Sequence, residues 1–397
     1  MKLSAIIVNY NVARFCEQAV AGLLASGLGS ELEVFVVDNS STDDSLHYLR
    51  DRFVGEAYRQ VYLIDAGANL GFGRANNLAA AQAKGEYILF LNPDTLIAED
   101  TLEQMLTFAD AHPDLGALGV SMTNEDGTFA PESRRGLPTP WTAFCKLSGL
   151  TALMPHSRRF GRYYMAYLSP AAPHATEVVS GACMMVRRDG RTDWFDPDYF
   201  MYGEDVDLSY RLMKEGKTNY YLPAALVHYK GESTNKTGFR YAHVFYGAML
   251  IFLRKHFPYY AFCLSPIIAL AIVLKALTSH LHAWWIDLRH ALSSNRGRQH
   301  QRGLLYLGTH GASLQHFAAE RDLPLRIVEA TAATHPEGHT RLDLTDIGTV
   351  VYDVHDFPRR DIIAHLQATA GRVRLALYDH QAQQLIAHGK QIHIPTR

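Results

Sequence analysis

The stretch LEVFVVDN (residues 32–39) is a mainly apolar run of strand length that ends abruptly at two polar residues. The same pattern appears in LSAIIV (residues 3–8) and in YILFLNPD (residues 87–94), and helix-like segments lie between these runs at residues 13–26 and 73–85. Short apolar runs that alternate with helical periodicity are typical of a parallel α/β sheet. Polar residues then gather at the carboxyl ends of the strands, the edge at which open α/β sheets bind ligands.

Composition narrows the class of protein. The chain has 397 residues and is 48% hydrophobic, so a hydrophobic core is expected. Its formal charge of -2 provides no overall electrostatic field that would attract nucleic acid. The cysteines (Cys16, Cys145, Cys183 and Cys263) lack metal-site spacing, which favours a reduced, cytosolic environment. The apolar run that ends at Asn9 is too short for a signal peptide, and we read it as a first strand.

The patterns divide the chain into three parts, residues 1–240, 241–295 and 303–397. Within the first part, residues 132–174 are rich in Pro, Arg and aromatic side chains, and we expect either a mobile lid or a plain connection there. Within the second part, residues 259–278 approach transmembrane length. Because Pro266 and Lys275 interrupt this stretch, an interfacial membrane helix competes with a helix buried against another domain or subunit.

The third part, residues 303–397, alternates strand and helix patterns and predicts a small Rossmann-like α/β domain. Its first strand is not followed by a GxGxxG motif, so the sequence gives little support to nucleotide binding there. Pro336 and Gly338 separate His335 from His339, which removes a helical metal pair, and we expect these histidines to be solvated. We expect this part to localise or regulate the protein.

Seven motifs along residues 1–240 occur in an order that resembles family 2 glycosyltransferases of the GT-A fold. The likeness is greatest to the branch that holds rhamnosyltransferases of bacterial cell-surface polysaccharide synthesis. The motifs are VNYN (8–11), VVDNSSTD (36–43), NLGFGRANN (69–77), LNPD (91–94), SGACMMVRRD (180–189), FDPDYFMYGEDVDLSYR (195–211) and VHYKGES (227–233). No single motif is enough to identify the family, but the order of all seven is specific for it.

The resemblance implies a site for a nucleotide sugar. It assigns Asp38 to the uracil or thymine base, although an Asp in DNSSTD is also a common turn former. The glycine-bearing turn before residue 73 lets backbone and amide groups approach a ribose or diphosphate. The residues expected at the donor are Asn9, Asp38, Asn69, Gly71, Asn76, Asn92 and Asp94.

A metal site is expected at Asp94 and His228. The stretch Asn92-Pro93-Asp94 stands where the family has its DxD motif, and a carboxylate at a strand end is a suitable ligand for Mg²⁺ or Mn²⁺. The matching histidine of relatives implies that His228 is the second ligand. Asn92 replaces the first Asp, so the cation depends partly on the diphosphate. An Asn-Pro turn without metal is the competing interpretation.

Catalysis is assigned by the resemblance to Asp205, with Glu204 beside it. Transfer with inversion needs one base to take the proton of the acceptor hydroxyl. A plain acidic cluster at a helix start is the alternative, and Asp207 is spaced to pair with Arg211. The basic residues Arg134, Arg135, Lys230 and Arg240 either clamp phosphates or, more in keeping with their residue type, are solvated.

The sequence thus predicts an inverting, metal-dependent transfer of a sugar from dTDP-rhamnose or a UDP-hexose to a hydroxyl of a glycan or a polyprenyl-linked acceptor. The expected location is the cytoplasmic face of the inner membrane, with no nucleic-acid partner. A non-catalytic binding protein on the same fold and a sugar nucleotidyltransferase are the alternatives. The second of these lacks the Gly-rich basic loop that it needs after the first strand.

Overall fold

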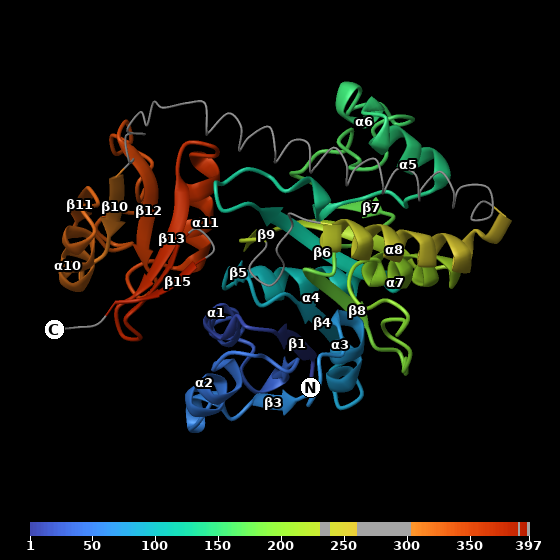
Figure 1. The fold of residues 1–397 in the computed structure, drawn as a ribbon, viewed down its shortest axis with the longest axis horizontal. Coiled ribbons are helices and arrows are strands. Elements are labelled where there is room, and N and C mark those ends of the chain that lie inside the picture. Colours follow the sequence, from blue (N-terminus) through green and yellow to red (C-terminus); the bar gives the residue numbers. More distant parts are fainter. Residues whose placement is uncertain (231–238, 260–302, 388–389, 395–397) are drawn as a thin grey trace.

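The structure is a computed structural model that describes residues 1–230, 239–259, 303–387 and 390–394 (Figure 1). The strands are β1 (Leu3–Asn9), β2 (Leu32–Asp38), β3 (Val61–Asp65), β4 (Tyr87–Leu91), β5 (Thr95–Ile97), β6 (Leu115–Thr123), β7 (His174–Thr176), β8 (Cys183–Arg187), β9 (Thr218–His228), β10 (Gly303–Leu307), β11 (Leu325–Val328), β12 (Ile347–Asp353), β13 (Arg374–Asp379), β14 (Gln384–Ala387) and β15 (Lys390–His393). The helices are α1 (Ala13–Leu24), α2 (Ser45–Arg52), α3 (Phe72–Ala80), α4 (Thr101–Ala111), α5 (Pro140–Leu147), α6 (Leu150–Leu153), α7 (Glu204–Lys214), α8 (Phe239–His256), α10 (Ala312–Glu320) and α11 (Arg359–Ala368).

The first sheet confirms the predicted α/β class and is mixed rather than wholly parallel. Its strand order is β3-β2-β1-β4-β8-β6-β9-β5, and β7 pairs with β9. The first four strands of this order are parallel, whereas β8 runs antiparallel to both β4 and β6. The strands β5 and β7 are also antiparallel to β9.

Alternating side chains explain why the sheet has helices on both faces. In β1, Leu3, Ala5 and Ile7 join a core with α1, α2 and α4, while Ile6 and Val8 join a second core with α3 and α7. Successive residues of a strand point to opposite faces, so a strand buried on both faces is apolar throughout. The apolar runs of the sequence are therefore central strands between two helical layers.

Strand pairing brings distant polar residues to one edge of this sheet. In the parallel register of β1 and β2, Asn9 lies opposite Asp38. The short strand β5 follows Asp94 directly, and its first residue, Thr95, pairs with His228 at the end of β9. The strand ends that the sequence analysis singled out thus meet in space.

The segment of residues 132–174 is more ordered than a plain loop. Thr139 begins α5 because its hydroxyl accepts a hydrogen bond from Thr142 N at 3.3 Å, and Pro140 occupies the first turn. The helix α6 and the strand β7 follow. The weak apolar periodicity of this segment hid these short elements.

The second sheet has the order β11-β10-β12-β13-β14-β15, and its first four strands are parallel. The terminal strands β14 and β15 form an antiparallel hairpin that the sequence analysis missed. Figure 1 shows this sheet and its helices beside the β5 and β9 edge of the first sheet. One apolar cluster joins the two, since Phe15, Leu96 and Val227 pack with Ile362 and Leu366.

The expectation that these C-terminal histidines are solvated is wrong for His339. His339 is fully buried, and its ring nitrogens lie 2.7 Å from the Tyr352 hydroxyl and 2.7 Å from the Thr369 hydroxyl. Burial, followed by the neighbouring His365, lowers the pKa of His339 to about 4. A neutral imidazole with partners on both nitrogens is stable in a core, which residue type alone did not reveal.

The proposed interfacial stretch, residues 259–278, lies outside the described residues except for Tyr259. Among the helices of the described ranges, none combines the length and the apolar character needed to cross a bilayer.

Candidate active site

A cavity of about 590 Å³ opens at the polar edge of the first sheet. Its walls come from the ends of β1, β4 and β9, the segment before α5, the loop before α7 and one side of α8. The predicted site residues that line it are Asn69, Asn92, Glu204, Asp205 and His228. The remaining ones, Asn9, Asp38, Gly71, Asn76 and Asp94, are absent from the lining formed by the described residues.

Asp94 and His228 form a close pair beside this cavity. The distance from His228 Nε2 to Asp94 Oδ1 is 3.3 Å, and Asn92 Nδ2 lies 3.4 Å from the same ring nitrogen. The side chains are largely buried, with 13% of His228 and 5% of Asp94 exposed. The β5 and β9 pairing holds this arrangement, because Tyr229 N also donates to the Asp94 carbonyl at 3.0 Å.

The donor atoms at this pair fit a hard divalent cation that shares its coordination with a phosphate ligand. A carboxylate oxygen and an imidazole nitrogen point to the same place, and both atom types bind Mn²⁺ or Mg²⁺. The His228 Nδ1 atom is buried and has no hydrogen-bond partner among the described residues. Two protein ligands are few for such a cation. This small number agrees with the expectation that the cation depends partly on the diphosphate, because Asn92 replaces an Asp.

Asp205 stands at the start of α7 with its carboxylate held from three sides. One oxygen pairs with the Arg135 guanidinium and accepts from Gly181 N at 3.1 Å, and the other accepts from Val206 N at 2.8 Å. The helix begins after Gly203, whose φ of 85° is favourable for glycine. Positive charge and backbone N–H groups at a helix N-terminus both favour a carboxylate in its ionised form.

Glu204 precedes Asp205 in the same helical turn but has a different environment. Its carboxyl is buried, and its Oε2 atom has no hydrogen-bond partner in the described part of the chain. Burial and then the adjacent Asp205 charge raise the pKa of Glu204 well above its usual range. Two neighbouring carboxyls therefore differ in their hydrogen-bond partners, and both border the cavity.

Asp38 is fully buried and bonded within its own turn. Its carboxylate accepts from Asn9 Nδ2 at 2.8 Å, from Ser41 N at 3.0 Å and from Ser41 Oγ at 2.7 Å. Asn9 and Asp38 thus act together, as the register of β1 and β2 requires. This contact shapes the turn that carries Asn39 into the cavity lining.

The turn before α3 is fixed by amide groups. Asn39 donates from Nδ2 to Asn69 Oδ1 at 3.0 Å, and that oxygen also accepts from Gly71 N at 3.1 Å. A Cβ at Gly71 would lie 2.3 Å from Phe200 O, so this glycine allows contact with the protein's own backbone. Asn76 is buried and donates to Phe72 O at 2.9 Å within α3.

Several cavity residues were missed by the sequence analysis or given the wrong environment. Solvation was the wrong expectation for Arg134, Arg135 and Lys230. Arg134 is buried over the rings of Phe129 and Tyr221, Arg135 pairs with Asp205, and Lys230 Nζ lies 2.5 Å from Glu132 Oε1. The Arg240 side chain lies outside the described part. The lining residues without a prediction include Tyr10, Asn39, Glu132 and Tyr163. Tyr10 and Asn39 lie inside two of the quoted motifs, whereas Glu132 and Tyr163 come from the segment of residues 132–174, which has no motif.

A cavity bordered by acidic side chains at the edge of an α/β sheet has the position of a ligand site in enzymes of the α/β class. A family model described as glycosyl transferase family 2 matches residues 4–192. The N-acetylglucosaminyl-diphospho-decaprenol L-rhamnosyltransferase of Mycobacterium tuberculosis is 32% identical over 254 residues, which cover 59% of this chain and 78% of that protein. The chain therefore belongs to glycosyltransferase family 2 and is a glycosyltransferase.

One further relative and one solved structure are also similar to this chain. The rhamnosyltransferase WbbL of Escherichia coli is 27% identical over 213 residues, which cover 49% of this chain and 77% of WbbL. Among solved structures, the mannosyltransferase PcManGT from Pyrobaculum calidifontis, in complex with GDP-Man and Mn²⁺, aligns with a TM-score of 0.45 and 18% identity. That alignment covers 93% of this chain and 86% of that one.

Proposed function

We propose that this glycosyltransferase moves a sugar, with inversion, from a nucleoside-diphosphate donor to a hydroxyl of a lipid-linked or glycan acceptor. The observation that carries the proposal is the placement of the Asp94 and His228 pair and of Asp205 around one cavity. The charged leaving group needs electrostatic stabilisation, and the acceptor hydroxyl needs a base. The pair and Asp205 would supply these two functions separately.

The proposed donor site extends from Asn69 and Asn39 to Asn92. These amides border the cavity next to the metal-binding pair, where a ribose and a diphosphate have hydrogen-bond partners. Asp38 and Asn9 support the turn at this site and are assigned to the end that holds the base. Gly71 and Asn76 fix the start of α3. We propose that they act on donor binding indirectly, by holding this turn in position.

Asp94 and His228 would hold Mg²⁺ or Mn²⁺ with oxygens of the diphosphate. The bound cation neutralises the charge that builds on the leaving nucleoside diphosphate. The Asn92 amide lies 3.4 Å from the same ring nitrogen, would give up this contact when the cation binds, and adds no negative charge. Because the protein supplies few ligands, we expect cation affinity to rise when the donor is bound.

In the transfer step, the acceptor oxygen forms a bond to the anomeric carbon while the bond from that carbon to the phosphate oxygen breaks. The acceptor proton passes to the Asp205 carboxylate, and the nucleoside diphosphate leaves on the opposite face. Arg135 and the N–H groups of Gly181 and Val206 hold the Asp205 carboxylate in position before the step. Glu204, with its raised pKa, is the second carboxyl that the acceptor meets.

The names of relatives favour a rhamnosyl donor and a lipid-linked acceptor. The mycobacterial relative is named as a rhamnosyltransferase for N-acetylglucosaminyl-diphospho-decaprenol, and WbbL is named as a rhamnosyltransferase. We therefore propose dTDP-rhamnose as donor and a polyprenyl-diphospho-sugar as acceptor, in cell-surface polysaccharide synthesis. A lipid-linked acceptor would bring the enzyme to the cytoplasmic face of the inner membrane.

The test compares Asp205→Asn, Asp94→Ala and Asp51→Asn in transfer and donor-binding assays. Asp205→Asn should lower kcat by about 10²- to 10⁴-fold with donor binding retained, because only the proton acceptor is lost. Asp94→Ala should weaken donor binding in the presence of Mn²⁺ as well as kcat. Asp51 lies on the exposed side of α2, so its variant should behave as wild type.

Wild-type turnover in Asp205→Asn would remove the base from the proposal. The donor is identified by incubating the enzyme with dTDP-rhamnose, UDP-glucose or UDP-N-acetylglucosamine and a polyprenyl-diphospho-N-acetylglucosamine, followed by mass spectrometry of the products. Parallel reactions with EDTA test the cation. Transfer that is unaffected by EDTA would reject the metal role of Asp94 and His228.

A further inference from the structure

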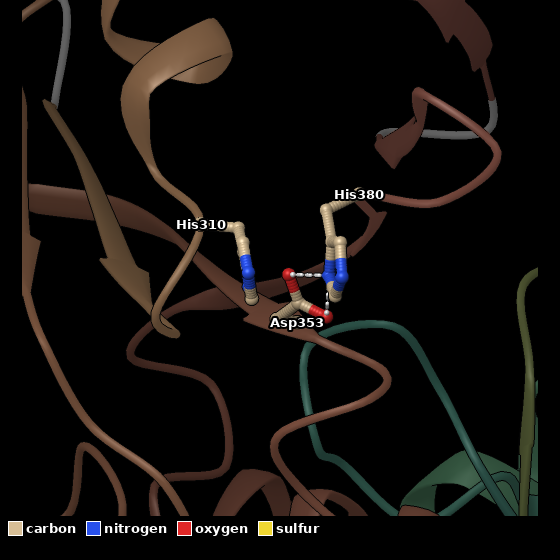
Figure 2. Close-up of side chains that lie close together, drawn as sticks. All are labelled: His310, Asp353 and His380. Carbon is tan, nitrogen blue, oxygen red and sulfur yellow. Dashed lines mark hydrogen bonds and ion pairs between the residues drawn. The ribbon is translucent and has the colours of Figure 1, made fainter.

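The second sheet holds a cluster of three side chains with metal-ligating atoms. His310 follows β10, Asp353 ends β12, and His380 follows β13. One ligand atom from each lies within 4.8 Å of the others. Figure 2 shows the two imidazole rings facing each other with the carboxylate of Asp353 between their lower ends.

The position of this cluster in the sheet is that of a ligand site. The parallel strands run in the order β11-β10-β12-β13, so the chain leaves β10 toward β11 on one side while β12 lies on the other. Ligands of open α/β sheets bind at the carboxyl ends of strands where the order reverses in this way. His310 and Asp353 lie on the two sides of that reversal, and His380 comes from the next strand.

Buried contacts hold the carboxylate in place. Asp353 is fully buried and accepts from Tyr306 Oη at 3.0 Å and from His355 N at 3.0 Å. His380 Nδ1 lies 3.1 and 3.0 Å from its two oxygens. Tyr306 and the His355 N–H group are outer partners of the kind that orient the ligands of metal sites.

The loop after β10 is fitted to the same carboxylate. A Cβ at Gly308 would lie 2.3 Å from Tyr306 Oη and 2.7 Å from Asp353 Cβ, so a glycine lets the chain pass directly over Asp353. His310 N then donates to Tyr306 Oη at 3.2 Å. The histidine is exposed, and its ring stacks on His380 with 3.8 Å between the centroids and an interplanar angle of 15°.

We propose that His310, Asp353 and His380 bind a borderline divalent transition metal, with Zn²⁺ as the preferred ion. Two imidazole nitrogens and one carboxylate oxygen are a common donor set for this ion, and a fourth position then stays open to water or another ligand. Binding requires the exposed His310 ring to turn out of the stack so that both rings point at the ion. His380 and Asp353 are already oriented by their contacts.

This site differs in chemistry from the one at Asp94 and His228. That pair offers one nitrogen and one oxygen beside a cavity suited to a diphosphate, whereas the cluster on the second sheet offers a complete three-ligand set. The cluster should therefore bind Zn²⁺ in the absence of nucleotide. The inference does not depend on the identity of the donor or acceptor.

The test uses the full chain, stripped with a chelator and dialysed, and titrated with Zn²⁺ by calorimetry without nucleotide. We expect one ion per chain with a Kd in the micromolar range or below. His310→Ala and His380→Ala should each weaken binding at least about tenfold. The matched control is His316→Ala, which removes an exposed histidine of α10 and should bind as wild type, and so should Asp94→Ala.

Circular dichroism of each variant confirms the fold, and His310→Ala is the informative one because its side chain is exposed. The proposal is overturned if the wild type fails to bind Zn²⁺ below about 100 µM, a free energy of about -5.5 kcal/mol. Equal weakening by His316→Ala, or loss of binding in Asp94→Ala, also overturns it. Failure of the glycosyl-transfer proposal would leave these binding results unchanged.

Discussion

At the scale of single residues, Glu204 and Asp205 show how neighbours in sequence acquire different chemistry. Asp205 is ion-paired with Arg135 and bonded by backbone N–H groups, whereas Glu204 Oε2 lacks a partner among the described residues. Burial and the charge of Asp205 raise the pKa of Glu204. In the folded protein Glu204 therefore holds its proton to higher pH than in the unfolded chain.

This difference predicts a pH-dependent effect of Glu204→Gln on stability. A carboxyl whose pKa is raised by folding lowers stability as pH rises from its unfolded pKa through its folded pKa. The amide of the variant cannot ionise. The stability of the variant minus that of the wild type should therefore be larger at pH 8.5 than at pH 4. Each unit of pKa shift corresponds to about 1.4 kcal/mol. Thermal unfolding of both proteins at the two pH values measures the gain, and a constant difference would contradict it.

At the scale of elements, the turn before α3 depends on close backbone contact. Gly71 has a φ of 80°, and Phe72 N donates to Phe200 O at 2.9 Å across this contact. The Phe200 loop borders the cavity and leads to Glu204 and Asp205. A turn in one part of the chain thus positions the loop that leads into α7, the helix that carries Glu204 and Asp205.

Gly71→Ala and Gly67→Ala separate two reasons for a glycine near this turn, the positive φ and the close contact with Phe200 O. Gly67 also has a positive φ, 68°, but a Cβ there meets no atom within 4 Å. We expect Gly67→Ala to cost about 1 kcal/mol of unfolding free energy from backbone strain alone. Gly71→Ala should cost at least about 2 kcal/mol more because its Cβ would meet Phe200 O, and it should lower kcat. Urea unfolding and the transfer assay measure these effects, and equal losses in the two variants would count against the contact.

At the scale of the whole molecule, the two sheets are joined by more than chain connectivity. Glu99, which follows β5, accepts hydrogen bonds from Arg359 N at 2.8 Å and Arg360 N at 3.0 Å in the first turn of α11. Burial raises the pKa of Glu99, but the backbone N–H groups of Arg360 and Arg359 outweigh it, so the pKa of this carboxyl is lowered. Carboxylates at helix N-termini are stabilising for this reason.

Glu99→Ala should therefore weaken the junction in a pH-dependent way. A carboxyl with a lowered folded pKa contributes stability above its unfolded pKa, and that contribution is lost as pH falls through the folded value. We expect a loss of about 1 kcal/mol at pH 7 and a smaller one at pH 3.5. The control is Glu329→Ala, which removes an exposed carboxylate after β11 and should change little. Chemical unfolding at both pH values measures the loss of unfolding free energy in each variant. Equal losses from the two variants would refute the role of Glu99.

The sequence by itself determined the α/β class, the two-sided burial of the central strands and the polar residues at their ends. Local periodicity carries this information because it encodes which face of a strand or helix is buried. The ordered motifs from Asn9 to His228 also identified the family before any contact was known. These features are local, or depend only on order along the chain.

Tertiary structure decided which of these residues meet. His228 reaches Asp94 because Thr95 pairs with it across the sheet, and Arg135 reaches Asp205 from a segment without strong periodicity. His310 and His380, which no sequence motif singled out, converge on Asp353 because three parallel strands end at one edge. Strand order and register are set by packing over the whole chain, so residues far apart in sequence become neighbours only once the sheets have formed.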